Sequence, residues 1–143
     1  YQVISGIEVM AVSLLTRRAP TQATVAGLVE ATQRMHEAAA AGDITNWGEA
    51  DERFHRELMR LSGNKKLHAV GCQLRDFAKR AHIVAVRLQT DAYRAQSTKS
   101  HTTLINSILA GDAREAAALH FNQRERGENA LVGIVEKFNL TNL

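Results

Sequence analysis

The 143-residue chain has a single cysteine and a single proline, and only 5% of its residues are aromatic. One cysteine cannot form a disulfide framework or a cysteine-based zinc site, so we interpret Cys72 as a small core residue in a reducing compartment. The longest apolar run covers only residues 130–135, whereas a membrane-spanning helix needs about 18 residues. We therefore expect a cytoplasmic protein that does not cross a membrane.

The chain also lacks a concentrated charge of one sign. Its 18 Lys and Arg residues are interleaved with 15 Asp and Glu residues, which leaves a net charge of +3. Few aromatic residues accompany the basic ones, so the pattern is typical of a solvated surface rather than of a nucleic-acid site. We expect no sequence-specific DNA binding by this chain. A Gly-rich phosphate loop, a Gly-x-Ser-x-Gly elbow and a His-Glu-x-x-His motif are absent too.

Helical periodicity is present throughout the sequence. Apolar residues recur with a period of about 3.6, and β-branched runs with a period of two are missing. Five of the expected helices cover residues 2–18, 44–61, 65–88, 91–109 and 113–138. The other, second along the chain, is capped by Thr21 or Thr24 and extends to about residue 40. Gly42 and Gly111 provide left-handed helix ends, and Asp43 an N-cap. Short connections between six helices predict an all-α antiparallel bundle.

The apolar stripe of the first helix is predicted from the spacing of its largest side chains. Its members are Val3, Ile7, Met10, Ala11 and Leu14. The fourth helix carries its stripe mainly on Leu74 and small residues, yet Ile83 and Val86 lie outside that stripe. Apolar residues away from the core stripe indicate a second buried face, so we predict a homodimer.

Polar residues occupy core positions on three of the expected helices. At about 100° per residue, Asp51 falls within the apolar stripe of the third helix, and His55 lies at its edge one turn later. His101 is central to the stripe of the fifth helix. Gln123 is central on the sixth, with His120 beside it. Three helices therefore point hydrogen-bonding or ligating groups into one core.

Two interpretations fit this set. A buried unpaired carboxylate costs several kcal/mol, so Asp51 is expected either in a satisfied Asp–His network or at a bound metal or ligand. One Asp with two His suits a divalent ion such as zinc, nickel or manganese. His82 is a weaker candidate that could face the same cavity. Arg75 and Arg94 could reach an anionic ligand, the alternative for each being a solvated surface position.

Four passages, taken in order, resemble the C-terminal effector domain of FadR-like transcription regulators in the GntR superfamily, the FCD domain. They are the opening helix from Tyr1 to Leu15, the Asp-x-x-x-His helix at 51–55, the Gly63-Asn64 turn, and the Ser-x-x-x-His helix with its turn at 97–112. The resemblance covers nearly the whole chain. It implies six or seven antiparallel helices around a central ligand cavity.

Many members of that family hold a divalent metal through one Asp and three His. The resemblance assigns three of these ligands to Asp51, His55 and His101. The third His is expected at position 123, where this chain has Gln123. His120 lies one turn earlier and is the alternative fourth residue. Gln123 can still bind a metal through its carbonyl oxygen or hydrogen-bond a metal-bound water or effector.

The resemblance also implies a function. Residues 1–143 would be the effector-binding and dimerisation domain of a bacterial regulator that senses a small carboxylate. Operator DNA would be bound by an N-terminal winged helix-turn-helix domain, and nothing in this chain resembles one. The alternatives are a structural dimerisation module with a vestigial cavity, which Gln123 favours, and a small helical metalloenzyme. The latter lacks a Glu-x-x-His pair and an obvious general base, so we expect no enzyme.

Overall fold

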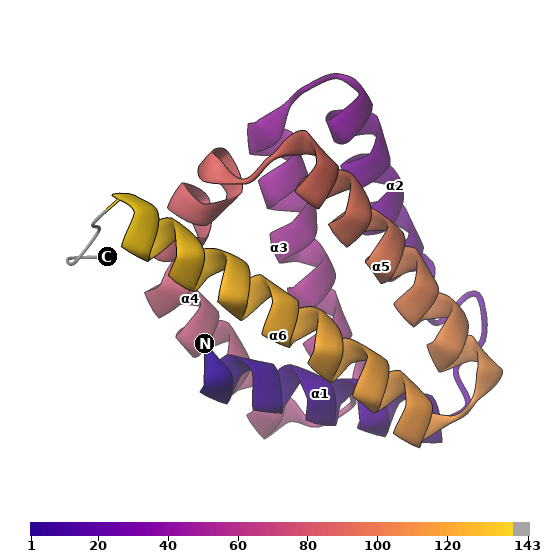
Figure 1. The fold of residues 1–143 in the computed structure, drawn as a ribbon. Helices are drawn as coiled ribbons and strands as arrows, with labels where there is room; N and C mark the ends of the chain where they lie inside the picture. The colour runs from indigo at the N-terminus through magenta and orange to yellow at the C-terminus, as the bar shows by residue number, and fades with distance from the viewer. Residues whose placement is uncertain (139–143) are drawn as a thin grey trace.

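Six α-helices make up residues 1–138, which is the part of the chain that the computed structural model describes, and no strand occurs among them (Figure 1). The helices are α1 (Gln2–Arg17), α2 (Ala26–Ala40), α3 (Ile44–Leu61), α4 (Lys65–Leu88), α5 (Asp91–Ala110) and α6 (Ala113–Phe138). The predicted all-α fold is confirmed, with six helices rather than seven. Their ends lie within a few residues of the predicted ones.

Local chemistry explains where most helices begin and end. Asp43 accepts a hydrogen bond from the backbone N–H of Asn46 at the start of α3. Gly42 and Gly111 have φ of 68° and 86°, so both adopt the left-handed conformation that glycine tolerates. The predicted cap of α2 is wrong: Thr21 and Thr24 bond to each other in a preceding turn, and α2 begins after Val25, which has no side-chain cap.

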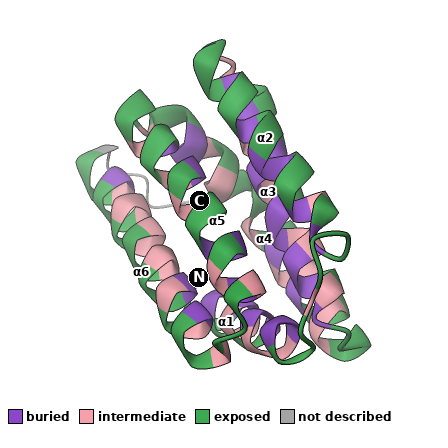
Figure 2. Cartoon of the chain, turned by 90° about the vertical axis from the view of Figure 1, so that its right-hand side faces the viewer, coloured by how far each residue is buried: buried purple, intermediate pink, exposed green. Residues whose placement is uncertain are grey.

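Helix packing encloses two apolar clusters. α2 packs on α3 and α1 on α6, while α5 contacts both α2 and α6. The larger cluster is formed mainly by residues of α1, α2, α3 and α5: Val12, Leu15, Val25, Leu28, Ala31, Phe54, Leu58, Leu104, Ile105, Ile108 and Ala116. In Figure 2 the buried segments follow the inward faces of the helices.

A smaller cluster lies between α2, α3 and α4. It contains Met35, Ala38, Trp47, Ala50 and Val86. Val86 is only 5% exposed, so one of the two residues behind the homodimer prediction packs within the same chain. Ile83 remains exposed, as does Phe77 further back on α4. The apolar surface of α4 thus differs from the predicted one.

The apolar stripe of α1 is rotated from its predicted position. Val3 and Met10 are more than half exposed, whereas Ile4, Val12 and Leu15 are buried together with the predicted Ala11. The buried face also contains Glu8, whose exposed fraction is 0%. The prediction chose the continuous apolar face, whereas the folded chain buries a face with a carboxylate in it. This rotation brings Glu8 into the interior.

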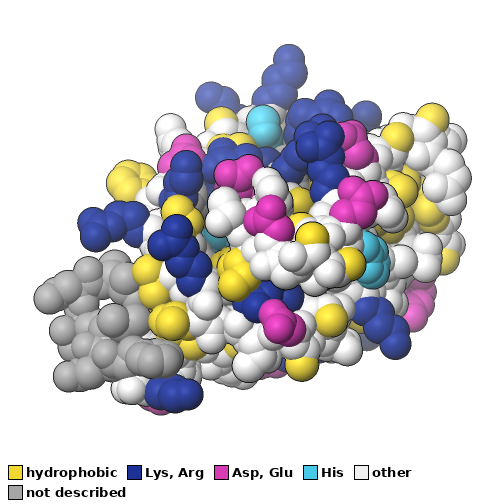
Figure 3. All heavy atoms as spheres, turned by 90° about the horizontal axis from the view of Figure 1, so that it is seen from above, with side chains coloured by type: hydrophobic (Ala, Val, Ile, Leu, Met, Phe, Trp, Pro, Cys, Tyr) yellow, Lys and Arg dark blue, Asp and Glu magenta, His cyan; other side chains and the backbone are white. Residues whose placement is uncertain are grey.

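The outer surface mixes charges of both signs. On the face shown in Figure 3, dark blue Lys and Arg side chains alternate with magenta acidic ones, and no single-sign patch covers that view. No helix among the described residues is both long and apolar enough to cross a membrane.

Candidate functional site

Asp51, His55 and His101 meet in the interior, and all three are at most 5% exposed. The first two lie one turn apart on α3, and His101 comes from α5. Asp51 Oδ1 is 3.8 Å from His55 Nε2 and 3.5 Å from His101 Nε2, and the two Nε2 atoms are 3.5 Å apart. These three atoms form a nearly equilateral triangle, and a hydrogen bond of 3.5 Å joins the two Nε2 atoms.

The ring orientation of His101 is fixed by its surroundings. Its Nδ1 donates to the backbone oxygen of Ser97 at 2.7 Å, which leaves Nε2 as the nitrogen that faces Asp51. The ring of Phe54 packs edge-on against His101 with centroids 4.3 Å apart. Burial lowers the pKa of His101, so a neutral imidazole with its lone pair on Nε2 points into the triangle.

Burial also keeps His55 neutral. Burial lowers its pKa to about 4, although the negative charges of Glu8 and Asp51 act in the opposite direction. Burial by itself would raise the pKa of Asp51, but the neighbouring histidines and Arg75 outweigh it and bring the value to about 2. A carboxylate and two neutral imidazoles therefore face one another at pH 7.

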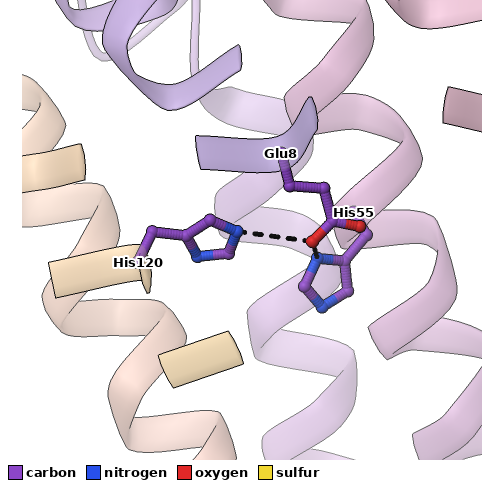
Figure 4. A group of neighbouring side chains, drawn as sticks. All are labelled: Glu8, His55 and His120. Atoms are coloured by element: carbon purple, nitrogen blue, oxygen red, sulfur yellow. Dashed lines mark ion pairs between the residues drawn. The ribbon is translucent and has the colours of Figure 1, made fainter. Parts of the chain in front are cut away.

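Glu8, which the sequence reasoning missed, occupies the other side of His55 (Figure 4). Its Oε2 lies 3.0 Å from His55 Nδ1, 3.4 Å from His120 Nε2 and 3.2 Å from Arg124 Nε. Glu8, His55 and His120 form a second buried group whose donor atoms lie within 4.8 Å of one another. The two groups share His55 and approach it from opposite ring nitrogens.

Arg75 compensates the charge of Glu8. Its Nη1 donates to Glu8 Oε1 at 2.5 Å, and its Nε and Nη2 donate to Glu52 Oε2. Burial would raise the pKa of Glu8, but Arg124, His55 and Arg75 hold it well below its usual range. Arg75 is 6% exposed and does not line the pocket beside the histidines. Arg75 is thus a buried counter-ion of Glu8 and Glu52.

Gln123 makes its hydrogen bonds outside the triangle formed by Asp51, His55 and His101. Its Nε2 donates to the backbone oxygen of Ser100 at 2.7 Å, and its Oε1 is 3.1 Å from His120 Nδ1. Both ends of the amide are therefore engaged. His120 is the buried member of this pair, at 1% exposed, whereas Gln123 is half-buried.

The structure places the remaining two candidates differently. His82 Nε2 lies 3.5 Å from Asp51 Oδ2, on the carboxylate oxygen that faces away from His55 and His101. Arg94 is buried at the junction of α4 and α5, where its Nη1 donates to the backbone oxygens of Val86 and Gln89. Arg94 therefore closes the C-terminal end of α4 and is not brought to the pocket.

A pocket of about 140 Å³ opens between α5 and α6 and reaches the histidines. Most of the residues that line it have polar or charged side chains: His55, Tyr93, Gln96, Ser97, Ser100, His101, His120, Gln123, Arg124, Arg126 and Gly127. A water molecule takes about 30 Å³ in the liquid, so the space suits a few waters or a small organic molecule. Gly127 lies opposite Tyr93, whose hydroxyl would be 3.6 Å from a side chain Cβ at this position.

Comparison with known families gives a match to the FCD domain, which covers residues 1–122. The matched range includes five of the six helices completely and the first part of α6, with His120 inside it and Gln123 just beyond. No curated protein sequence matches the chain significantly.

Proposed function

Because this chain belongs to the FCD domain family, the effector-binding domain of GntR-family transcription regulators, we propose that it senses a small carboxylate in the pocket between α5 and α6. The family resemblance is confirmed. FCD domains belong to regulators rather than enzymes, so no catalytic role is assigned. The buried triads could hold a metal ion. We propose that a divalent ion is bound by Asp51, His55 and His101.

The observation that carries this proposal is the triangle of Asp51 Oδ1, His55 Nε2 and His101 Nε2, with edges of 3.5 to 3.8 Å. Ligands about 2.1 Å from a tetrahedral zinc ion are separated by about 3.4 Å, so the triangle needs only a small contraction. The hydrogen bond from His101 Nδ1 to Ser97 matches the outer-shell bond that orients a metal-bound histidine.

Glu8 supports the same arrangement from the other side of His55. A His55 proton on Nδ1 would be donated to Glu8 Oε2 at 3.0 Å, leaving the Nε2 lone pair for the ion. Carboxylate–histidine–metal arrangements of this kind fix the tautomer and orientation of the ring. Gln123 contributes no ligand in this arrangement, because both ends of its amide are engaged. Three protein ligands leave coordination positions for the effector.

The pocket supports a carboxylate as the effector. His55 and His101 line it, so the open positions of the ion face the space that a ligand would fill. Arg124 and Arg126 supply positive charge on the α6 side of the pocket. A carboxylate oxygen bound to the ion would complete its coordination, while the rest of the molecule contacts the polar lining.

Regulation would follow from a population shift in a cytoplasmic homodimer. An effector that binds one arrangement of two such domains more tightly biases the spacing of the DNA-binding domains attached to them. Operator DNA would be contacted only through an N-terminal domain. The exposed Phe77 and Ile83 on α4 favour a second copy as partner. A structural dimerisation module is the second candidate, favoured by Gln123 at the position of the third His.

Calorimetry on chelator-treated protein tests this function. Zinc, nickel and manganese are titrated first, and a panel of small di- and hydroxycarboxylates is then titrated with and without the tightest metal. We expect metal binding in wild type, measurably weaker metal binding in His101→Ala, and carboxylate binding only with metal present. His36→Ala, an exposed histidine on α2, is the matched control. Wild type that binds neither metal nor any carboxylate would favour the structural module.

A further inference from the structure

Glu8, His55 and His120 each have one buried side-chain atom that could bind a metal ion and has no hydrogen-bond partner. These atoms are Glu8 Oε2, His55 Nδ1 and His120 Nε2. Glu8 Oε2 is 3.0 Å from the His55 nitrogen and 3.4 Å from the His120 nitrogen, and Figure 4 shows both rings directed at this one oxygen. All three residues are at most 3% exposed. Buried polar atoms in this state call for an explanation, and a proton or a cation between them provides one.

The tautomer of His120 is set by Gln123. Because Gln123 Nε2 donates to the Ser100 carbonyl, its Oε1 is the end that faces His120 Nδ1 and accepts a hydrogen bond from it. A neutral His120 therefore has its lone pair on Nε2, directed at the carboxylate of Glu8. Two electron-rich atoms 3.4 Å apart repel each other unless a positive charge lies between them. Gln123 thus orients His120 as a ligand.

His55 cannot satisfy both of its sides. A neutral imidazole carries one N–H, yet its Nδ1 faces Glu8 and its Nε2 faces Asp51 and His101. With the proton on Nδ1, Glu8 is satisfied and the lone pair points at Asp51 and His101. With the proton on Nε2, that side is satisfied and the lone pair points at Glu8 and His120. Each tautomer leaves one buried set of ligands open to a cation.

We propose that Glu8, His55 and His120 form a second position for a divalent ion, alternative to the one at Asp51, His55 and His101. The separations of 3.0 and 3.4 Å from Glu8 Oε2 are close to the roughly 3.4 Å between ligands of a tetrahedral zinc ion. One carboxylate and two imidazoles suit zinc and related divalent ions. His55 provides one lone pair at a time, so each chain binds one ion, at either position.

Charges around Glu8 allow this position. Arg75 is paired with Glu52 as well as with Glu8 Oε1, so it leaves Oε2 available. Arg124 Nε lies 3.2 Å from Glu8 Oε2, and its side chain lines the pocket. An ion at this position displaces Arg124 toward the pocket. An anion in the pocket would pair with Arg124 there and so favour the Glu8 position.

Nitrogen-resolved NMR of the histidine rings distinguishes the two positions, with zinc chloride as the probe on chelator-treated, ¹⁵N-labelled protein. Zinc at the new position shifts His120 Nε2 and His55 Nδ1, whereas zinc at the other position shifts His101 Nε2 and His55 Nε2. In wild type we expect the resonance of His120 Nε2 to move on zinc saturation. In His101→Asn the His120 shift persists, and zinc affinity falls by no more than roughly tenfold.

Two variants complete the test. Glu8→Gln should abolish the zinc-dependent shifts of His120 Nε2 and His55 Nδ1, and His120→Asn should abolish that of His55 Nδ1. Both variants should leave the His101 shift in place. His120→Asn keeps the Glu8 ion pairs with Arg75 and Arg124, so it remains informative where Glu8→Gln does not fold. Zinc binding that shifts His101 but never His120, in wild type and in the variants, overturns this inference alone. Absence of zinc binding in wild type overturns both metal positions.

Discussion

The two halves of the interior are equally buried but differ in what fills them. Around Leu28, Phe54 and Leu58 the helices are joined by apolar side chains with no exposed surface. Around Glu8, His55 and His101, helices α1, α3 and α5 are joined by carboxylates and imidazoles that are at most 5% exposed. The first half stabilises the fold through buried apolar area. The second carries a desolvation cost that apolar residues would avoid, and the proposed metal site gives this polar half a function.

Replacing Arg75, the counter-ion in the polar half of the interior, should cause the largest loss of unfolding free energy. Arg75→Met leaves Glu8 and Glu52 without their shared partner, and removal of one member of a buried pair costs about 3–5 kcal/mol. Arg56→Met is the matched control, because Arg56 also pairs with Glu52 but is about one-third exposed, so its loss should cost about 0–1 kcal/mol. Urea unfolding measures both. Equal losses of unfolding free energy in the two variants would contradict the prediction that the buried ion pairs of Arg75 contribute more than the partly exposed one of Arg56.

Breaking the apolar half should cost nearly as much without touching the site. Leu28→Ala removes a side chain with 0% exposure, which typically costs about 2–5 kcal/mol. The additional stability that a saturating metal gives should be the same as in wild type, since Leu28 lies in the apolar cluster. Thermal unfolding with and without zinc compares the two increments. If zinc no longer raised the stability of Leu28→Ala, the apolar and polar halves of the interior would not be independent.

Acidification should lower the unfolding free energy through the polar half of the interior. The pKa of His55 is about 4 in the folded chain and 6.5 in the reference state, so the unfolded chain binds more protons between these values. Stability is therefore fully present above pH 6.5 and falls by about 3 kcal/mol as the pH drops to 4. His55→Asn should flatten this part of the profile. A wild-type unfolding free energy that is constant from pH 7 to 4 would contradict the buried neutral His55.

The smallest predicted effect concerns position 123, where the family resemblance led us to expect a histidine. Gln123→His introduces that histidine and removes the hydrogen bond that orients His120. We expect zinc affinity to rise by roughly tenfold, about 1.4 kcal/mol, through a fourth ligand to the ion at Asp51, His55 and His101. Calorimetric titration measures the change. Unchanged or weaker binding would indicate that position 123 does not approach the ion.

Sequence reasoning found the fold and part of the site because periodicity exposes polar residues within apolar stripes. Asp51, His55 and His101 were identified in this way, and the structure buries all three. Glu8 was missed because α1 has a second, continuous apolar face through Val3 and Met10, and single-helix periodicity favours that face. A buried carboxylate becomes visible only when its partners Arg75 and Arg124, from two other helices, are placed beside it.

Tertiary hydrogen bonding also decided the roles of Gln123 and Arg94. Both occupy positions that periodicity places near the core, and nothing in a helical pattern shows which partner a long polar side chain selects. Gln123 bridges α6 to the Ser100 carbonyl of α5, and Arg94 caps the end of α4. The sequence pattern placed Val86 on an outer face of its helix. Its packing against Trp47 is a contact between two helices, which the pattern of one helix does not show. These features depend on the relative placement of helices rather than on any one of them.

Thermal melting of metal-free wild type in the presence of zinc, nickel or manganese tests the central claim most directly, namely that the polar half of the interior is a cation site. At about 100 times its dissociation constant, a metal that binds only the folded chain adds about 2.7 kcal/mol. For a chain of this length that corresponds to a rise in melting temperature of roughly 8 °C, which a chelator should reverse. A melting temperature that ignores all three metals, together with metal-free protein by elemental analysis, would contradict the claim.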